Sequence, residues 1–133
     1  MLPAFKGHPD ELTVFVQTFH TLQRSSIKTL LECLGIVSAL AGDLRLKQLE
    51  IFLVVAHQEG LTMKEISVLT RQSESIVSRG VRAMTSEGDA GALAPAFGLL
   101  ELLANRADRR LRHVVLTDKG QDLRRELARL MPS

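Results

Sequence analysis

The chain has 133 residues, of which 45% are hydrophobic, and it contains five Phe but neither Trp nor Tyr. This length suffices for one domain whose core needs neither a disulfide nor a metal. The formal net charge of +2 at pH 7 is too small by itself to indicate a nucleic-acid partner.

No apolar run reaches the roughly 18 residues of a membrane span, so we expect no membrane partner. The first residues lack the short apolar core and the cleavage site of a signal peptide. Cys33 is the only cysteine, so no internal disulfide can form. Together these features predict a cytoplasmic protein.

Residues 10–40 are predicted to form one long helix or two joined helices. Apolar side chains recur there at spacings of three and four, and further apolar residues leave only thin polar faces between them. A monomeric helix needs a single apolar stripe, so this segment is either buried centrally or contacts a second subunit. We assign residues 1–43 as a dimerisation segment, with an interface made by Leu12, Phe15, Phe19, Leu22, Ile27 and Leu30.

Residues 44–58 are predicted to form a second helix that ends before Gly60. Its expected inward residues are Leu46, Leu49, Phe52, Leu53 and Ala56. Thr62 and Glu65 then have the spacing of a capping box, in which each side chain accepts a hydrogen bond from the other residue's backbone N–H. The box predicts a short helix over residues 63–70, whose inward residues are Ile66 and Leu69.

Arg71 and Gln72 are predicted to form a tight turn, and Ser73 to cap a helix that runs to about residue 87. Gly80 costs roughly 1 kcal/mol relative to Ala in the middle of a helix, and a close crossing with a neighbouring helix would explain it. The expected inward residues are Val77, Val81 and Met84.

Residues 88–98 have the composition of a loop. Two apolar runs, 99–104 and 111–117, then flank an arginine-rich segment and predict an antiparallel hairpin, although the first run alone fits a helix equally well. Thr117 is the expected cap of a last helix over residues 118–130.

The order helix, short helix, tight turn, helix, hairpin, helix is typical of a winged helix-turn-helix. We therefore predict a mainly α fold with a two-stranded β-hairpin wing, with residues 44–117 as the DNA-binding region and 118–133 as a C-terminal helix. The outer face of helix 73–87 would enter the major groove of double-stranded DNA, although any exposed helix shows a similar polar face. The residues expected to contact DNA there are Ser73, Ser75, Ser78, Arg79 and Arg82.

The wing over residues 105–112 gathers positive charge. Residues 105–133 hold eight Arg or Lys against four Asp or Glu, a balance of +4, whereas the first 23 residues have a balance of −1. We expect Asp108 to pair with Arg110 and to orient it, since a narrow minor groove attracts such an arginine. A solvated turn is the alternative interpretation. The wing residues expected to contact DNA are Arg106, Arg109, Arg110 and Arg112.

The segment Asp108-Arg109-Arg110, followed by the run from Val115 through Leu116-Thr117 to Gly120, resembles the wing signature of the multiple-antibiotic-resistance regulator (MarR) family. Residues 44–67 and 73–84 look like the helices that precede this wing. The resemblance covers roughly residues 44–130. It implies a homodimeric transcriptional regulator with Arg110 in the minor groove and helix 73–87 in the major groove. The chain departs from the family at Gly80 and at the 88–98 loop, which lengthens the connection to the wing.

The sequence gives weaker support for other functional sites. Cys33 is interpreted as a buried structural thiol, although some relatives in the family use a cysteine as an oxidant sensor. The histidines, at positions 8, 20, 57 and 113, lack the spacing of metal ligands, and no catalytic grouping stands out. We therefore expect a protein that is not an enzyme and that needs no cofactor or metal.

Our interpretation is a sequence-specific transcriptional regulator that binds an inverted-repeat operator in double-stranded DNA as a homodimer. The sequence leaves room for a small-molecule effector and identifies none. Two alternatives remain open. One is a winged-helix module for protein interaction or assembly, and the other is a DNA-binding accessory of replication, partition or phage development.

Overall fold

The computed structural model describes residues 24–131. A helical turn, Arg24–Lys28, leads into α2 (Thr29–Leu40), and α3 (Leu46–His57) follows. Leu12, Phe15, Phe19 and Leu22 of the predicted dimer interface lie outside the described residues. The described part of the long N-terminal segment is helical, as predicted.

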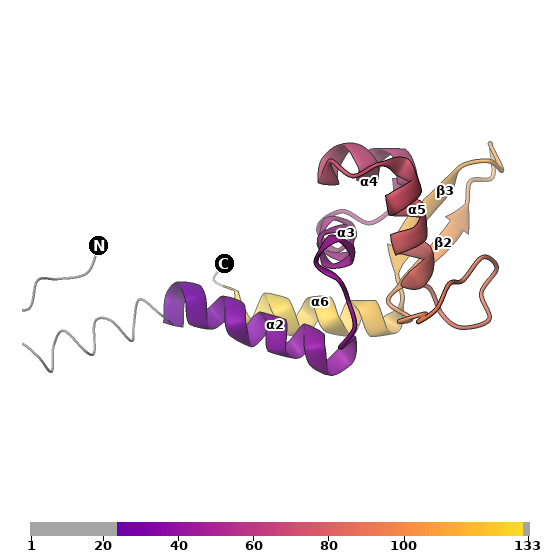
Figure 1. Ribbon diagram of the computed structural model, residues 1–133. Coiled ribbons are helices and arrows are strands. Elements are labelled where there is room, and N and C mark those ends of the chain that lie inside the picture. The colour runs from indigo at the N-terminus through magenta and orange to yellow at the C-terminus, as the bar shows by residue number, and fades with distance from the viewer. Residues whose placement is uncertain (1–23, 132–133) are drawn as a thin grey trace, which may run out of the picture.

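The remaining elements follow the predicted order, with one further short strand, β1 (Leu61–Thr62). They are α4 (Met63–Thr70), α5 (Glu74–Ala83), β2 (Leu100–Ala104), β3 (Arg112–Leu116) and α6 (Asp118–Leu130). The helices α2 and α6 run antiparallel at one end of the molecule, and α4, α5 and the β2–β3 hairpin form the other end (Figure 1). Between these two ends lies α3. No helix within residues 24–131 is long and apolar enough to cross a membrane.

The hairpin is confirmed, and it belongs to a three-stranded antiparallel sheet with the order β1-β3-β2. In the hairpin, Leu100 pairs with Leu116 and Ala104 with Arg112, so the apolar run 99–104 forms a strand rather than a helix. The sequence did not predict β1, because two residues are too few to show an alternating pattern. Its pairing of Leu61 with Val114 joins the base of the wing to the start of α4.

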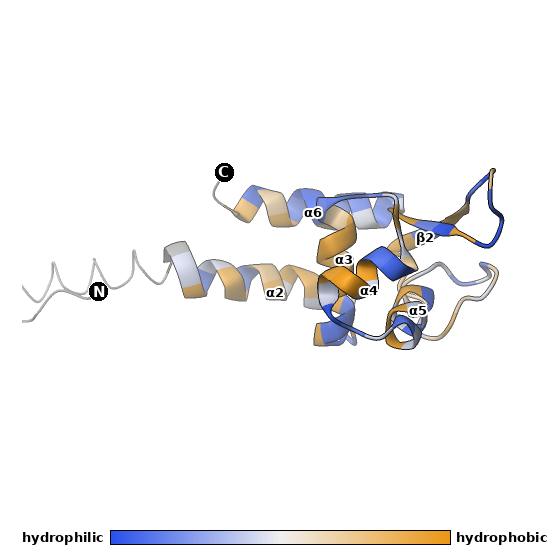
Figure 2. Ribbon diagram, turned by 90° about the horizontal axis from the view of Figure 1, so that it is seen from above, coloured by the Kyte–Doolittle hydropathy of each residue, from blue (hydrophilic) through white to orange (hydrophobic). Residues whose placement is uncertain are grey.

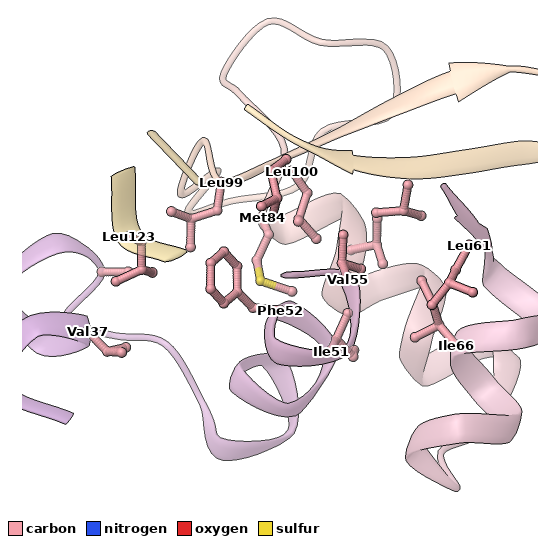
Figure 3. Close-up of a cluster of buried hydrophobic side chains, with 14 of the residues drawn as sticks. Val37, Ile51, Phe52, Val55, Leu61, Ile66, Met84, Leu99, Leu100 and Leu123 are labelled. Carbon is pink, nitrogen blue, oxygen red and sulfur yellow. The ribbon is translucent and has the colours of Figure 1, made fainter. Parts of the chain in front are cut away.

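The core surrounds α3, whose Ile51, Phe52 and Val55 are fully buried. Figure 3 shows Phe52 lying among Met84, Leu99 and Leu123, which come from the end of α5, the start of the wing and α6. The core therefore ties the helix pair, the wing and the last helix together. Cys33 of α2 is also buried, as expected for a structural thiol.

For three residues, the predicted inward orientation was wrong. Leu46 is 74% exposed, Leu53 is 46% exposed and Leu69 is 57% exposed. Apolar residues surround most of α3, so periodicity alone could not select which stripe faces the core. Contacts with α4, α5, β3 and α6 select the stripe that contains Ile51 and Val55. Helix α4 is so short that, within it, only Ile66 is buried.

Helix α5 was predicted to run to residue 87, and it ends at Ala83. The predicted inward residues Val77, Val81 and Met84 are all fully buried. The end was misplaced because backbone N–H groups of the 88–98 loop bind the carbonyls of Arg82 and Ala83. This tertiary capping replaces a further helical turn.

Candidate nucleic-acid interface

The turn between α4 and α5 is built by local capping. The Thr62 hydroxyl accepts a hydrogen bond from the Glu65 N–H at 3.3 Å, and Glu65 Oε1 accepts one from the Thr62 N–H at 3.0 Å. The Thr62 hydroxyl also donates to Glu65 Oε1 at 2.9 Å. The bond from the Thr62 backbone N–H, and then the bond from the Thr62 hydroxyl, lower the pKa of Glu65. At the other end of α4, Arg71 adopts the left-handed conformation with φ 58°, which turns the chain toward α5.

Gln72 holds this turn against α3. Its side chain is buried, and its Nε2 donates to the carbonyl of Lys47 at 3.1 Å and to a carboxylate oxygen of Glu50 at 3.3 Å. From the sequence, Gln72 was predicted only to lie in the turn. A polar residue between two helices gives no signal of whether it is buried.

Gly80 lies where α5 crosses α3. A Cβ built on Gly80 would lie 2.8 Å from Cδ1 of Ile51, closer than carbon atoms pack. The close helix crossing that would explain a mid-helix glycine is therefore confirmed. It fixes the distance between the outer face of α5 and the core.

Four of the five predicted contact residues lie on the outer face of α5, and they differ in solvent exposure. Ser73, Ser75 and Arg79 are exposed, and Ser78 is half-buried. The Ser73 hydroxyl caps the helix by accepting from the Ile76 N–H at 3.2 Å. The side chain with the greatest reach toward a groove is thus Arg79.

Arg82, the fifth predicted residue, has a different environment. It is half-buried, and its Nε donates to the carbonyl of Gly91 at 2.8 Å. This carbonyl belongs to the 88–98 loop, which therefore lies against the C-terminal end of the predicted reading face.

On the wing, the predicted pairing of Asp108 with Arg110 is present. Asp108 Oδ1 accepts from the Arg110 backbone N–H at 3.0 Å and from its Nε at 3.2 Å. The Arg110 side chain is nevertheless 91% exposed. Asp108 thus holds the guanidinium of Arg110 at Nε, while the side chain stays open to solvent.

The remaining wing arginines lie around one hollow. Arg106, Arg109 and Arg112, together with Ala104 and Asn105, line a hollow of about 300 Å³. The guanidinium of Arg112 donates to the carbonyl of Arg109, which closes the turn on itself. Like charges are gathered at the tip of an exposed hairpin, where an anion would lower their mutual repulsion. Figure 2 shows this tip as a hydrophilic end of the molecule.

His113 and Asn105 form a pair at the base of the wing that was not predicted from the sequence. His113 Nδ1 lies 2.8 Å from the carbonyl oxygen of Gly60, and its Nε2 lies 2.9 Å from Asn105 Nδ2. Since a carbonyl only accepts and an amide nitrogen only donates, these partners fit a neutral imidazole with its proton on Nδ1. Asn105 Oδ1 in turn accepts from the N–H groups of Ala107 and Asp108.

From the sequence, His113 showed only that it lacks the spacing of a metal ligand, because nothing there places it next to Gly60. A signal for Asn105 was available in the sequence. An asparagine at the start of a turn often accepts hydrogen bonds from the backbone N–H groups two and three residues later. In the described residues, His, Cys, Asp and Glu nowhere form a group of three that could hold a metal.

No protein-family model matches the chain, and no curated protein matches it either. Solved structures do match. A transcriptional regulator from Thermotoga maritima has a TM-score of 0.62 and 21% sequence identity, over 85% of this chain and 72% of that chain. FabT of Streptococcus pneumoniae, solved in complex with DNA, has a TM-score of 0.60 and 16% identity, over 92% and 75%.

MepR of S. aureus, also solved in a DNA complex, has a TM-score of 0.55 and 16% identity, over 89% of this chain and 82% of that chain. These identities are low, so the likeness is one of fold. The winged-helix fold predicted from the order of elements is therefore confirmed, and it is the fold of known bacterial regulators.

Proposed function

We propose that this protein is a transcriptional regulator of the MarR family that binds double-stranded DNA in a sequence-specific manner as a homodimer. The observation that carries the proposal is the wing, where Asp108 pairs with the guanidinium of a highly exposed Arg110. The wing motif that resembles this family and the fold shared with regulators solved on DNA both support it.

In the proposed complex, α5 lies in a major groove and the wing tip approaches the adjacent minor groove. Arg79 is long enough to grip guanine through two hydrogen bonds, and the hydroxyls of Ser75 and Ser78 reach phosphates or base edges. Arg110 enters the minor groove, where the negative potential is strongest over A·T-rich sequence. The other three wing arginines contact phosphates.

The helical segment Arg24–Leu40 supports the proposed dimer. Ile27 is 63% exposed and Leu30 is 55% exposed, which is unusual for neighbouring apolar residues on a helix. This face continues into an apolar cavity of about 240 Å³ between α2, α3 and α6. Leu53, which was wrongly predicted to face the core, lines the same cavity. A second copy of the chain would cover this apolar surface, with residues 1–43 as the dimerisation segment.

A two-fold dimer reads a two-fold sequence, so we propose an inverted repeat with half-site centres about one helical turn, roughly 10 base pairs, apart. Selection of bound sequences from a random duplex pool tests this directly. The expected result is an inverted repeat, and a single asymmetric half-site would contradict the dimeric arrangement.

The salt dependence separates DNA binding from the alternative of a protein-interaction module. If about six phosphates are neutralised per dimer, log affinity should fall with log salt at a slope near −5. A chain that binds no random duplex at low salt would contradict the proposed function and favour the protein-interaction module. Genomic mapping of bound sites then separates a regulator, found at promoters, from an accessory of replication, partition or phage development.

A further inference from the structure

We propose that the 88–98 loop ends the DNA-reading face of α5 by holding Arg82 to itself, so that Arg82 anchors the loop and contacts no base. This inference rests on the proposed function. It restricts base contacts on α5 to the N-terminal part of the helix, with Arg79 as the last reading residue.

Three residues form one stripe along the outer face of α5. Ser75, Arg79 and Arg82 are spaced by four and three residues, which places them above one another on a helix. Without the loop, the two arginines would be equivalent. Yet Arg79 is exposed, whereas Arg82 is half-buried.

The loop causes this difference. Arg82 Nε donates to the Gly91 carbonyl at 2.8 Å. A Cβ built on Gly91 would lie 3.4 Å from Nε of Arg82 and within 4.0 Å of its central guanidinium carbon. The loop backbone therefore packs directly on the guanidinium, and glycine keeps the contact free of a side chain.

Further bonds fix the loop in this position. The N–H groups of Leu93, Phe97 and Gly98 donate to the carbonyls of Arg82, Ala83 and Thr85, each at 3.0 Å. The last carbonyls of a helix have no backbone donor within the helix, and here the N–H groups of Leu93 and Phe97 supply donors to Arg82 and Ala83. The loop is thus the C-terminal cap of α5, and the side chain of Arg82 is part of that cap.

The other end of the loop is tied to α6. Lys119 Nζ donates to the Phe97 carbonyl at 2.8 Å, and the Thr117 hydroxyl donates to the Gly98 carbonyl. In both views the loop and the wing tip project toward the same side of the molecule (Figures 1 and 2). The loop is therefore held beside α5 by hydrogen bonds at both of its ends.

The loop itself supplies no cation for DNA at this end of α5. Residues 86–98 contain Glu87 and Asp89, both exposed, and no Lys or Arg. The cations that contact the loop belong to Arg82 and Lys119, and both donate to its carbonyls. We therefore expect little attraction between the loop and a phosphate.

The experiment compares Arg82→Gln, Arg82→Ala and Arg79→Gln in the full chain. Gln places its Nε2 at the same point along the side chain as Nε of Arg, so Arg82→Gln keeps a donor for Gly91 and removes the charge. Each variant is used to select bound sequences from a random duplex pool, and the salt slope is measured on the sequence selected by the wild type. Amide exchange at Leu93 and Phe97 is measured in the free protein.

We expect Arg82→Gln to select the wild-type sequence with an unchanged salt slope, and Arg79→Gln to lose preference at one base position. We expect Arg82→Ala to leave both DNA measurements unchanged and to speed amide exchange at Leu93 and Phe97 about tenfold, since one hydrogen bond of the cap is lost.

Loss of base preference or of a unit of slope in Arg82→Gln would overturn the boundary at Arg79. Unchanged exchange in Arg82→Ala would overturn the anchoring role of Arg82. A wild-type chain that binds no duplex would overturn the proposed function together with the reading boundary, whereas the exchange measurement would still test the anchor by itself.

Discussion

Gly120 in the first turn of α6 lies directly against the carbonyl oxygen of Leu99, the residue that precedes β2, and a Cβ at position 120 would overlap that oxygen. The same carbonyl accepts a hydrogen bond from the Thr117 N–H at 3.1 Å. The glycine of the Leu116-Thr117-x-x-Gly120 motif therefore has a mechanical role, because it lets α6 start against the base of the wing.

We expect Gly120→Ala to lower the free energy of unfolding by about 3 kcal/mol, since the backbone of Leu99 cannot move aside without disturbing β2. The matched control is Gly35→Ala in α2, where a Cβ would meet nothing within 4 Å. That variant should raise stability by about 0.5–1 kcal/mol through helix propensity. Urea unfolding at one fixed protein concentration measures both, and equal stability of the two variants would contradict the packing argument.

The capping box of α4 gives a prediction about pH. The Thr62 backbone N–H and then the Thr62 hydroxyl lower the pKa of Glu65 below its ordinary value of 4.5. A carboxylate with a lowered pKa stabilises the folded state above that ordinary value, and the contribution is lost as the pH falls toward the folded pKa. Glu65→Gln keeps an acceptor oxygen and cannot titrate.

The stability of Glu65→Gln relative to wild type should therefore increase as the pH is lowered below about 4.5 and be constant between pH 6 and 8. The measurement is the difference in unfolding free energy between the two proteins at several pH values. A difference independent of pH would show that the carboxylate has no special role. At neutral pH, Thr62→Ala should cost about 1 kcal/mol through loss of the cap.

For the wing, two physical accounts of Asp108→Ala differ in sign. Removing a negative charge near DNA should tighten binding if charge alone matters. If Asp108 orients Arg110, the freed arginine must instead be ordered on binding, which costs roughly 0.5–1.5 kcal/mol. We expect weaker binding, by about 2- to 12-fold, on the same duplex at fixed salt.

The control for that measurement is Glu101→Ala, which removes an exposed carboxylate from the same hairpin. It should leave affinity unchanged or increase it. Arg110→Ala should lose affinity broadly, with any loss of preference confined to the A·T-rich flank. Tighter binding by Asp108→Ala would mean that the wing is only a positively charged loop.

His113 connects Gly60 to Asn105, and His113→Phe should loosen the wing tip. The carbonyl of the half-buried Gly60 would lose a partner, which costs about 1 kcal/mol. Asn105 would no longer be held, so amide exchange at Ala107 and Asp108 should become faster. Exchange measured by NMR checks this, with the exposed His57→Phe as control. Unchanged exchange at the wing tip would contradict the supporting role of His113.

The dimer proposal is tested with Ile27→Glu and Leu30→Glu combined in the full chain. Both side chains are more than half exposed, so the charges should disturb no buried core of the single chain. We expect the wild type to sediment as a dimer at micromolar concentration and the variant as a monomer. Val68→Glu on α4, at a residue 70% exposed, is the control and should remain dimeric. A monomeric wild type would contradict the proposed interface.

Where the chain carries strong local signals, the sequence predicted the structure to the residue. Thr62 with Glu65, Ser73 and Thr117 each place a helix start, and all three caps are present. The pairing of Asp108 with Arg110 is of the same kind, because two residues two positions apart in a turn must lie close together. Caps and turns depend on hydrogen bonds within about five residues, so the sequence alone contains them.

What the tertiary structure decided is which of several equivalent local features is used. Apolar residues surround most of α3, and only packing against α5, β3 and α6 makes Ile51 rather than Leu53 a core residue. Likewise, Arg79 and Arg82 are equivalent on the helix, and only the distant carbonyl of Gly91 distinguishes them. His113 meets Gly60 across 53 positions of sequence. Such contacts arise only after the chain has folded back on itself, because they join segments whose local sequences contain no information about one another.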